Sequence, residues 1–251
     1  MNPHQITLKN YNFTYDTYGN LHRDLSYKEY GELLHFYSNS IYIGGKFWSG
    51  DSLPLQDDDL ANCIAKEESK VLEIVILLQN TVPGFDKVGK LLELGCGIGS
   101  FMYHLINSNL SLVGCDISKF ALQSSLAIYG KTRFDIKMSE IFELPNIDIA
   151  EEKWDYIVCF DFLEHIKCDN LLLEKLKKML IGGGKLVLEV PIFDTADLGK
   201  LENEEFLFPE HHIHLYCESG LDLLFQHLNL RLISKKRIRD GKKILYILDH
   251  P

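Results

Sequence analysis

The chain has 251 residues, of which 46% are hydrophobic and 25% are charged, the ordinary balance of a soluble globular protein. Its net charge of −10 argues against double-stranded nucleic acid as a partner, because such a partner favours a basic face. No apolar run approaches the roughly 20 residues of a membrane span, and the opening MNPHQITLKNYNF lacks the apolar core of a signal peptide. We therefore expect a cytoplasmic protein that binds neither nucleic acid nor membrane.

The cysteines show no C-x-x-C spacing, and three of them lie inside apolar segments. This usage indicates reduced, mostly buried thiols and no structural zinc site. The six are Cys63, Cys96, Cys115, Cys159, Cys168 and Cys217.

Residues 1–57 are rich in Tyr, Asn, His and Gly. Aromatic side chains in such a polar, turn-rich context suit a lid packed over another part of the chain. An irregular wrap without ligand contact is the alternative. We therefore divide the chain into an aromatic-rich lid, 1–57, and a ligand-binding domain, 58–251.

A helix is predicted from Asp58, because acids suit the positive end of a helix dipole and apolar stripes follow as far as TVPG. Beyond it, apolar strands alternate with helical patterns, which indicates a parallel sheet covered on both faces. The strands are expected at 90–95, 111–116, 133–139, 154–160 and 184–191, with helices at 101–109, 118–130 and 168–181 between them.

The last segment, 230–250, contains two apolar strands around Asp240-Gly241, which is a hairpin signal. The predicted fold is therefore α/β, a doubly wound and mostly parallel seven-stranded sheet that ends in an antiparallel C-terminal hairpin.

The most informative motif is LLELGCGIGSF, in which Gly95, Gly97 and Gly99 follow the first predicted strand. In doubly wound sheets, ligands bind outside the carboxyl ends of the strands, and the first loop is glycine-rich where a ligand approaches the backbone. Asp116 ends the second predicted strand, where an acid can accept bonds from two ribose hydroxyls. Together these features predict a cofactor that contains adenosine.

The spacing of the glycines narrows the choice of cofactor. A dinucleotide site has G-x-G-x-x-G, whereas this loop has G-x-G-x-G with Glu93 two residues before it. An acid there would repel a pyrophosphate and would suit a ligand with an amine and a positive sulfonium.

Four segments in order, LLELGCGIGSF, GCDIS, MSEIFELP and DYIVCFDFLEHI, resemble the class I S-adenosylmethionine-dependent methyltransferases over about residues 90–190. The closest likeness is to the small-molecule branch with its quinone, sugar and natural-product enzymes. The resemblance implies a Rossmann-like methyltransferase fold, S-adenosyl-L-methionine as cofactor and S-adenosyl-L-homocysteine as product.

The resemblance also implies roles for individual residues in cofactor binding. Gly95 and Gly97 would line the methionine moiety, Glu93 would fix the loop and the cofactor amine, Asp116 would bind the ribose and Ile117 would pack on the adenine. The alternatives are a purely structural glycine turn and a helix-capping Asp116.

Three further positions complete the cofactor site implied by the resemblance. Ser139 and Glu140 would lie near the adenine amine, and Phe160 would offer its backbone to the methionine amine. The family more often has Asp where this chain has Glu140, which is otherwise a surface acid.

Methyl transfer to a hydroxyl needs in-line positioning and a group that removes a proton. The first candidates follow the fourth strand in FDFLEHI, where Asp161, Glu164 and His165 lie close in sequence, and the resemblance points to Glu164-His165 as a recurring acid–His pair. The alternative for His165 is a packed histidine bonded to backbone.

The second group lies in EHHIHLY, whose H-x-H-aliphatic-aromatic wording resembles the acceptor pocket of the family. It contains His211, His212 and His214, and surface or capping roles are the alternative. We predict His214 as the base, with His165 second and Asp161 as a further catalytic group. The spacing of acids and histidines does not assign a metal site, and a divalent ion such as Mg²⁺ stays an open alternative.

We expect 192–218 to form a substrate-pocket insertion. Its Tyr, His and acidic residues favour a small polar acceptor, and O-methylation of a sugar or sugar nucleotide is the specific prediction. N- or C-methylation of another metabolite, a nucleotide-cofactor oxidoreductase and a non-catalytic scaffold are the alternatives, and the oligomeric state stays open.

Overall fold

The computed structural model describes residues 5–49, 53, 56–130, 135–138, 152–194, 207 and 210–250. Two compact units divide the chain: Met1–Gly31 together with Cys159–Pro251, and Glu32–Val158. We call them the first and the second unit. Their boundary falls within one strand, at residues 158 and 159.

A seven-stranded sheet confirms the predicted α/β fold class. The β6–β7 and β7–β8 pairs are parallel, whereas the β10–β13 and β12–β13 pairs are antiparallel. In spatial order the strands are β12 (Arg231–Ile238), β13 (Lys243–Asp249), β10 (Leu180–Pro191), β9 (Trp154–Phe160), β6 (Gly89–Leu94), β7 (Leu110–Asp116) and β8 (Asp135–Met138).

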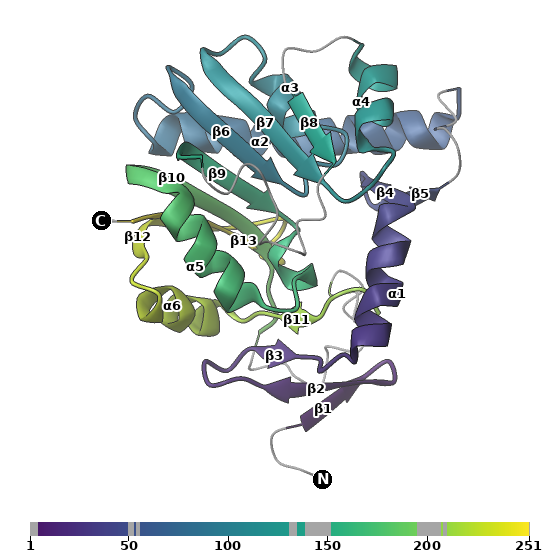
Figure 1. Cartoon of the computed structure of the whole chain (residues 1–251), viewed down its shortest axis with the longest axis vertical. Helices are drawn as coiled ribbons and strands as arrows, with labels where there is room; N and C mark the ends of the chain where they lie inside the picture. Colours follow the sequence, from purple (N-terminus) through teal and green to yellow (C-terminus); the bar gives the residue numbers. More distant parts are fainter. Residues whose placement is uncertain are drawn as a thin grey trace. The chain divides into compact units, whose positions relative to one another are not determined.

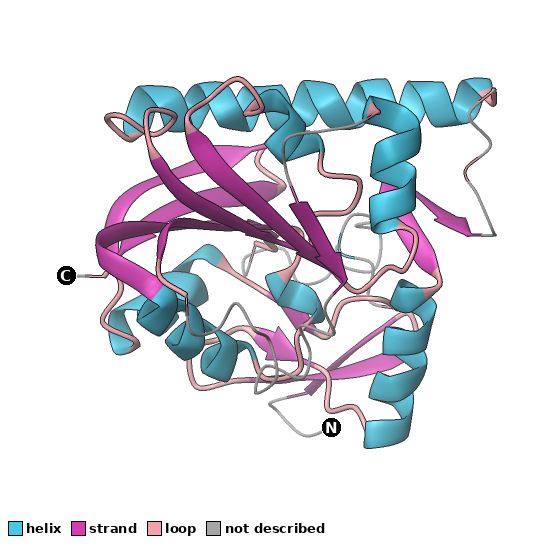
Figure 2. Cartoon of the chain, turned by 45° about the horizontal axis from the view of Figure 1, so that its top comes forward, coloured by secondary structure: helices cyan, strands magenta, loops and turns pink. Residues whose placement is uncertain are grey.

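The second unit contains the strand–helix alternation that the sequence predicted, and Figures 1 and 2 show β6, β7 and β8 side by side with helices around them. The side chain of Asp57 caps the long helix α2 by accepting a bond from the Asp59 N–H at 2.8 Å. The helices are α2 (Asp58–Thr81), α3 (Ser100–His104) and α4 (Ala121–Tyr129), and a two-stranded hairpin joins β4 (Ser40–Ile43) to β5 (Lys46–Ser49).

The core of the second unit explains its strand pattern. Leu91, Leu92 and Leu94 of β6 are all buried, as expected for a parallel strand covered on both faces. The buried side chains of α2 recur at helical spacing, which gives the helix one packed face. They are Leu60, Val71, Ile74, Val75 and Leu78.

The first unit holds an element that the sequence did not indicate, a four-stranded antiparallel sheet. Phe13 and Leu21 of this sheet are fully buried and share a core with Leu215. The aromatic N-terminal segment therefore builds part of a core together with residues from near the other end of the chain. The strands are β1 (Gln5–Leu8), β2 (Tyr11–Tyr15), β3 (Leu21–His22) and β11 (His214–Leu215).

The other elements of the first unit include η3 (Leu163–His165), α5 (Asp169–Met179) and α6 (Glu218–His227), and α1 (Tyr27–Ser38) begins in this unit. The predicted hairpin at Asp240-Gly241 is confirmed, because both residues have positive φ, 54° and 82°, between β12 and β13. The functional division into a lid, 1–57, and a binding domain, 58–251, stays a prediction.

Candidate active site

The glycine loop after β6 owes its composition first to its own backbone. Gly95, Gly97 and Gly99 have φ of 71°, 52° and 80°, in the left-handed region that residues with a Cβ rarely adopt. Around Gly97, an added Cβ would meet one described atom within 4 Å, the backbone oxygen of Tyr42 at 3.9 Å. All three positions therefore require the backbone freedom of glycine, and at Gly97 the described residues also leave open space beside the loop.

Asp116, at the end of β7, holds this loop in place. Its Oδ2 accepts a bond from the Gly97 N–H at 2.7 Å, and its Oδ1 accepts one from the Ser118 N–H at 2.7 Å. A carboxylate offers about four acceptor sites, so further sites remain for ligand hydroxyls. The ribose role of Asp116 stays a prediction.

Glu93 of β6 is an acidic residue buried in the second unit. It is only 5% exposed, and its Oε2 is buried without a hydrogen-bond partner among the described residues. Burial, together with the neighbouring Glu67 and Asp116, raises the pKa of Glu93 well above its ordinary value. A buried acid beside two other acids favours a positively charged neighbour, and an ammonium or sulfonium group of a ligand has that charge.

The other predicted cofactor residues are only partly covered by the structure. Ile117 follows β7 and is half-buried, and Phe160 ends β9 and is also half-buried. Ser139 and Glu140 lie outside the described residues. The roles of all four stay predictions.

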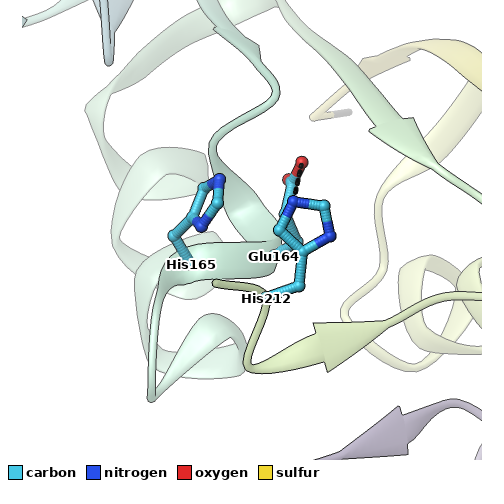
Figure 3. Close-up of side chains that lie close together, drawn as sticks. All are labelled: Glu164, His165 and His212. Atoms are coloured by element: carbon cyan, nitrogen blue, oxygen red, sulfur yellow. Dashed lines mark ion pairs between the residues drawn. The ribbon is translucent and has the colours of Figure 1, made fainter. Parts of the chain in front are cut away.

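The first unit brings His212 beside the adjacent pair Glu164 and His165, and we call these three side chains the Glu164 cluster (Figure 3). Glu164 is fully buried, and its Oε1 lies 3.9 Å from Nε2 of His212. The two imidazole rings meet edge to face, with 4.8 Å between their centroids. The Ile213 N–H donates to the carbonyl of Glu164 at 2.8 Å and so holds His212 beside this turn.

Burial decides the charges of the Glu164 cluster. It raises the pKa of Glu164 well above its ordinary value, and Asp161 adds to this effect. It lowers the pKa of His165 to about 4 and that of His212 well below its ordinary value. At neutral pH the two imidazoles are therefore uncharged, and the raised pKa of Glu164 means that burial opposes the ionised form of its carboxyl group.

His214, the predicted base, is buried in β11 and lies outside the Glu164 cluster. Its Nε2 lies 3.0 Å from the Ile166 carbonyl oxygen. Because a carbonyl only accepts, Nε2 carries a hydrogen, and Nδ1 lies 3.8 Å from Oδ2 of Asp169. That oxygen also accepts a bond from the hydroxyl of Tyr216 at 2.8 Å.

Asp161 takes part in an ion network. It pairs with Lys243, which also lies 3.4 Å from Oε1 of Glu189. Its backbone has a φ of 48°, which is uncommon for a residue other than glycine and fixes the start of the turn that leads to Glu164. The catalytic roles of Asp161, His165 and His214 stay predictions.

Sequence reasoning had named His212 and Glu164 separately but missed that they meet. The available signal was the pair of polar motifs FLEHI and EHHIH in otherwise apolar surroundings. Along the part of the chain that the structure describes, no helix has both the length and the apolar character needed to cross a membrane.

Curated relatives match parts of the chain, and two of them have names that state an activity. The tRNA U34 carboxymethyltransferase of Sulfurovum sp. (strain NBC37-1) is 28% identical over 45% of this chain and 38% of its own length. The tRNA N(3)-cytidine methyltransferase METTL2 of Xenopus tropicalis is 23% identical over 66% of this chain and 56% of its own length. This chain thus spans little more than half the length of the Xenopus protein and less than half the length of the Sulfurovum protein.

Among solved structures, a 1,6-didemethyltoxoflavin-N1-methyltransferase from Burkholderia thailandensis, with bound 1,6-didemethyltoxoflavin and S-adenosylhomocysteine, covers 97% of this chain and 97% of its own. Its TM-score is 0.62 at 11% sequence identity, so the likeness concerns the fold. A family model described as "Methyltransferase domain" matches residues 68–235, which is more than half of the chain. The glycine loop, the sheet and this match agree, and the chain belongs to the methyltransferase domain family.

Proposed function

We propose that this protein transfers a methyl group from S-adenosyl-L-methionine to a small polar acceptor, with a hydroxyl of a sugar or sugar nucleotide as the preferred target. The observation that carries the cofactor assignment is Glu93, a buried acid with an unpartnered oxygen close to Asp116 and the glycine loop. The domain family and the fold support the same assignment.

The residues present fit this cofactor in charge and shape. Glu93 would accept the charge of the methionine ammonium group, and Asp116 would bind the ribose while it holds Gly97. The left-handed glycines keep side chains away from the loop face. When bound, the cofactor supplies a methyl group activated on a positively charged sulfur.

The acceptor hydroxyl must lose a proton during the transfer, and a positioned base typically contributes about 10²–10⁴-fold. His214, His165 and Asp161 are our candidates for this step. In His214 the accepting atom would be Nδ1, because Nε2 donates to the Ile166 carbonyl. In His165 it would be Nε2, because Nδ1 lies 3.3 Å from the His211 carbonyl oxygen.

A tRNA acceptor is the second candidate, because both curated relatives described above are named as tRNA-modifying enzymes. The net charge of −10 opposes it, since phosphate contacts need basic side chains. Transfer to nitrogen or carbon of another metabolite is the remaining alternative within methyl transfer.

Two measurements test the proposal. S-adenosyl-L-homocysteine should raise the melting temperature of the protein and NAD should not, since only the former carries an aliphatic ammonium group for Glu93. Labelled methyl groups from S-adenosyl-L-methionine should then pass to pooled sugar nucleotides and not to total tRNA. Labelling of tRNA alone would overturn the assignment of a small-molecule acceptor. A melting temperature that does not change with S-adenosyl-L-homocysteine would overturn the cofactor assignment.

A further inference from the structure

The Glu164 cluster contains the kinds of atom that bind metal ions. Glu164, His165 and His212 each place one nitrogen or oxygen so that these atoms lie within 4.8 Å of one another (Figure 3). Neither the glycine loop nor Asp116 belongs to this group. Two imidazoles and one carboxylate form a ligand set known from zinc enzymes and from ferrous sites, whereas Mg²⁺ prefers oxygen ligands alone.

We propose that Glu164, His165 and His212 bind a divalent transition-metal ion of the zinc or ferrous type. Ligand atoms at about 2.0–2.2 Å from one ion lie about 3–4 Å from each other. The set is slightly wider than this, so a small inward movement of the side chains would accompany binding.

Glu164 gives the strongest reason. It is fully buried, and neither of its carboxyl oxygens has a hydrogen-bond partner in another described residue. A buried polar group without partners is costly, and native proteins contain few of them. A metal ion would satisfy this carboxylate and would keep it ionised in a buried place.

His165 is arranged as a metal-binding histidine usually is. Its Nδ1 lies 3.3 Å from the His211 carbonyl oxygen, and a carbonyl can only accept, so Nδ1 carries the hydrogen. The lone pair is then on Nε2. Metal-binding histidines almost always donate their other N–H to a carboxylate, a carbonyl or water, which fixes the ring.

His212 reaches the cluster through backbone contacts between distant segments. The Ile213 N–H donates to the Glu164 carbonyl at 2.8 Å, and the His214 ring donates to the Ile166 carbonyl at 3.0 Å. The hydroxyl of Tyr216 donates to Oδ2 of Asp169 at 2.8 Å. These bonds hold the two segments in one register, so that the ring of His212 lies beside Glu164. In this arrangement His214 and Tyr216 are positioning residues.

Three protein ligands would leave at least one coordination position open, as in catalytic zinc sites. Metal binding itself does not depend on the proposed methyl transfer. A His165 whose lone pair is on the metal could not also be the base.

The test uses the full chain, stripped of metal with a chelator and dialysed. Titration with Co²⁺ should give visible ligand-field bands that saturate at about one ion per chain, and Zn²⁺ should remove them whereas Mg²⁺ should not. Absence of stoichiometric Co²⁺ and Zn²⁺ binding would overturn the proposal. A strong thiolate charge-transfer band would do so too, because it would place the ion on cysteines such as the exposed Cys168.

Glu164→Gln and His212→Asn should each weaken Zn²⁺ binding by at least about tenfold, since even outer partners of metal ligands are worth 10–100-fold. His211→Asn is the matched control, because His211 contacts His165 through a backbone carbonyl that the substitution keeps. Unchanged affinity in both cluster variants would refute the site.

Folding and cofactor binding are checked on the same samples. Far-ultraviolet circular dichroism and the melting shift with S-adenosyl-L-homocysteine should match the wild type in His211→Asn and in at least one cluster variant. A protein whose melting temperature rises with S-adenosyl-L-homocysteine but which binds no metal would refute only the metal site. A protein that binds metal but not S-adenosyl-L-homocysteine would refute only the proposed cofactor.

Discussion

The backbone N–H of Gly97 donates a 2.7 Å hydrogen bond to Oδ2 of Asp116, which joins the glycine loop to the acid at the end of β7. The glycine loop and Asp116, which the sequence predicted as separate cofactor contacts, are therefore bonded to each other. A change at either residue acts on the shape of the loop as well as on any ligand beside it.

Asp116→Asn should weaken binding of S-adenosyl-L-homocysteine by about tenfold to 100-fold, because hydrogen bonds to a charged group contribute about 1.5–3 kcal/mol. Isothermal titration measures the affinity. Asp155→Asn is the matched control: Oδ2 of Asp155 accepts from the Lys90 N–H at 2.8 Å and so holds the opposite end of β6. An affinity within about twofold of the wild type for Asp116→Asn would remove Asp116 from the ribose site.

Glu93 should make the affinity for S-adenosyl-L-methionine rise with pH. Burial raises the pKa of this carboxyl, so the free protein keeps it protonated above the ordinary range for Glu. A cationic ligand favours the ionised form, so binding releases a proton and is weaker at low pH. Affinity measured over a pH series should climb until the raised pKa is passed. In Glu93→Gln the curve should be flatter and the affinity lower, and an equal slope in both proteins would contradict the assignment.

Gly97→Ala should lose both stability and cofactor affinity. With a φ of 52°, the position costs roughly 1–2 kcal/mol for a residue with a Cβ. Gly183→Ala is the comparison, because Gly183 has a φ of 80° and no described atom lies within 4 Å of its would-be Cβ. Thermal unfolding should show a similar loss of stability for both variants, whereas only Gly97→Ala should bind S-adenosyl-L-homocysteine more weakly. Normal binding by Gly97→Ala would show that the loop tolerates a side chain.

His214→Gln separates a base from a positioning residue. A base role predicts a fall in single-turnover methyl transfer of about 10²–10⁴-fold, with unchanged affinity for both cofactor and Zn²⁺. A positioning role predicts that Zn²⁺ affinity and turnover fall together, since the bond to the Ile166 carbonyl helps to hold the segment of His212. Full activity with full metal affinity would leave His214 with neither role.

Local patterns in the sequence were sufficient for several features. The α/β class follows from apolar strands that alternate with helices, and α2 begins at the predicted Asp58 after an acidic cap. The turn at Asp240-Gly241 needs positive φ, which a tight dipeptide signal reveals. The sequence also identified the glycine loop. It explained the three glycines by a ligand close to the backbone, whereas their positive φ is already a sufficient reason for glycine.

The tertiary structure decided what depends on contacts between distant segments. β3 pairs with β11, so the aromatic N-terminal residues share a core with Leu215, and no periodicity in either segment predicts that pairing. The Glu164 cluster arises in the same way, because one hydrogen bond from Ile213 to the Glu164 carbonyl sets His212 beside a carboxyl far away in sequence. Spacing along a chain reveals ligands on one helix or loop, whereas ligands from two loops meet only once the backbone between them has folded.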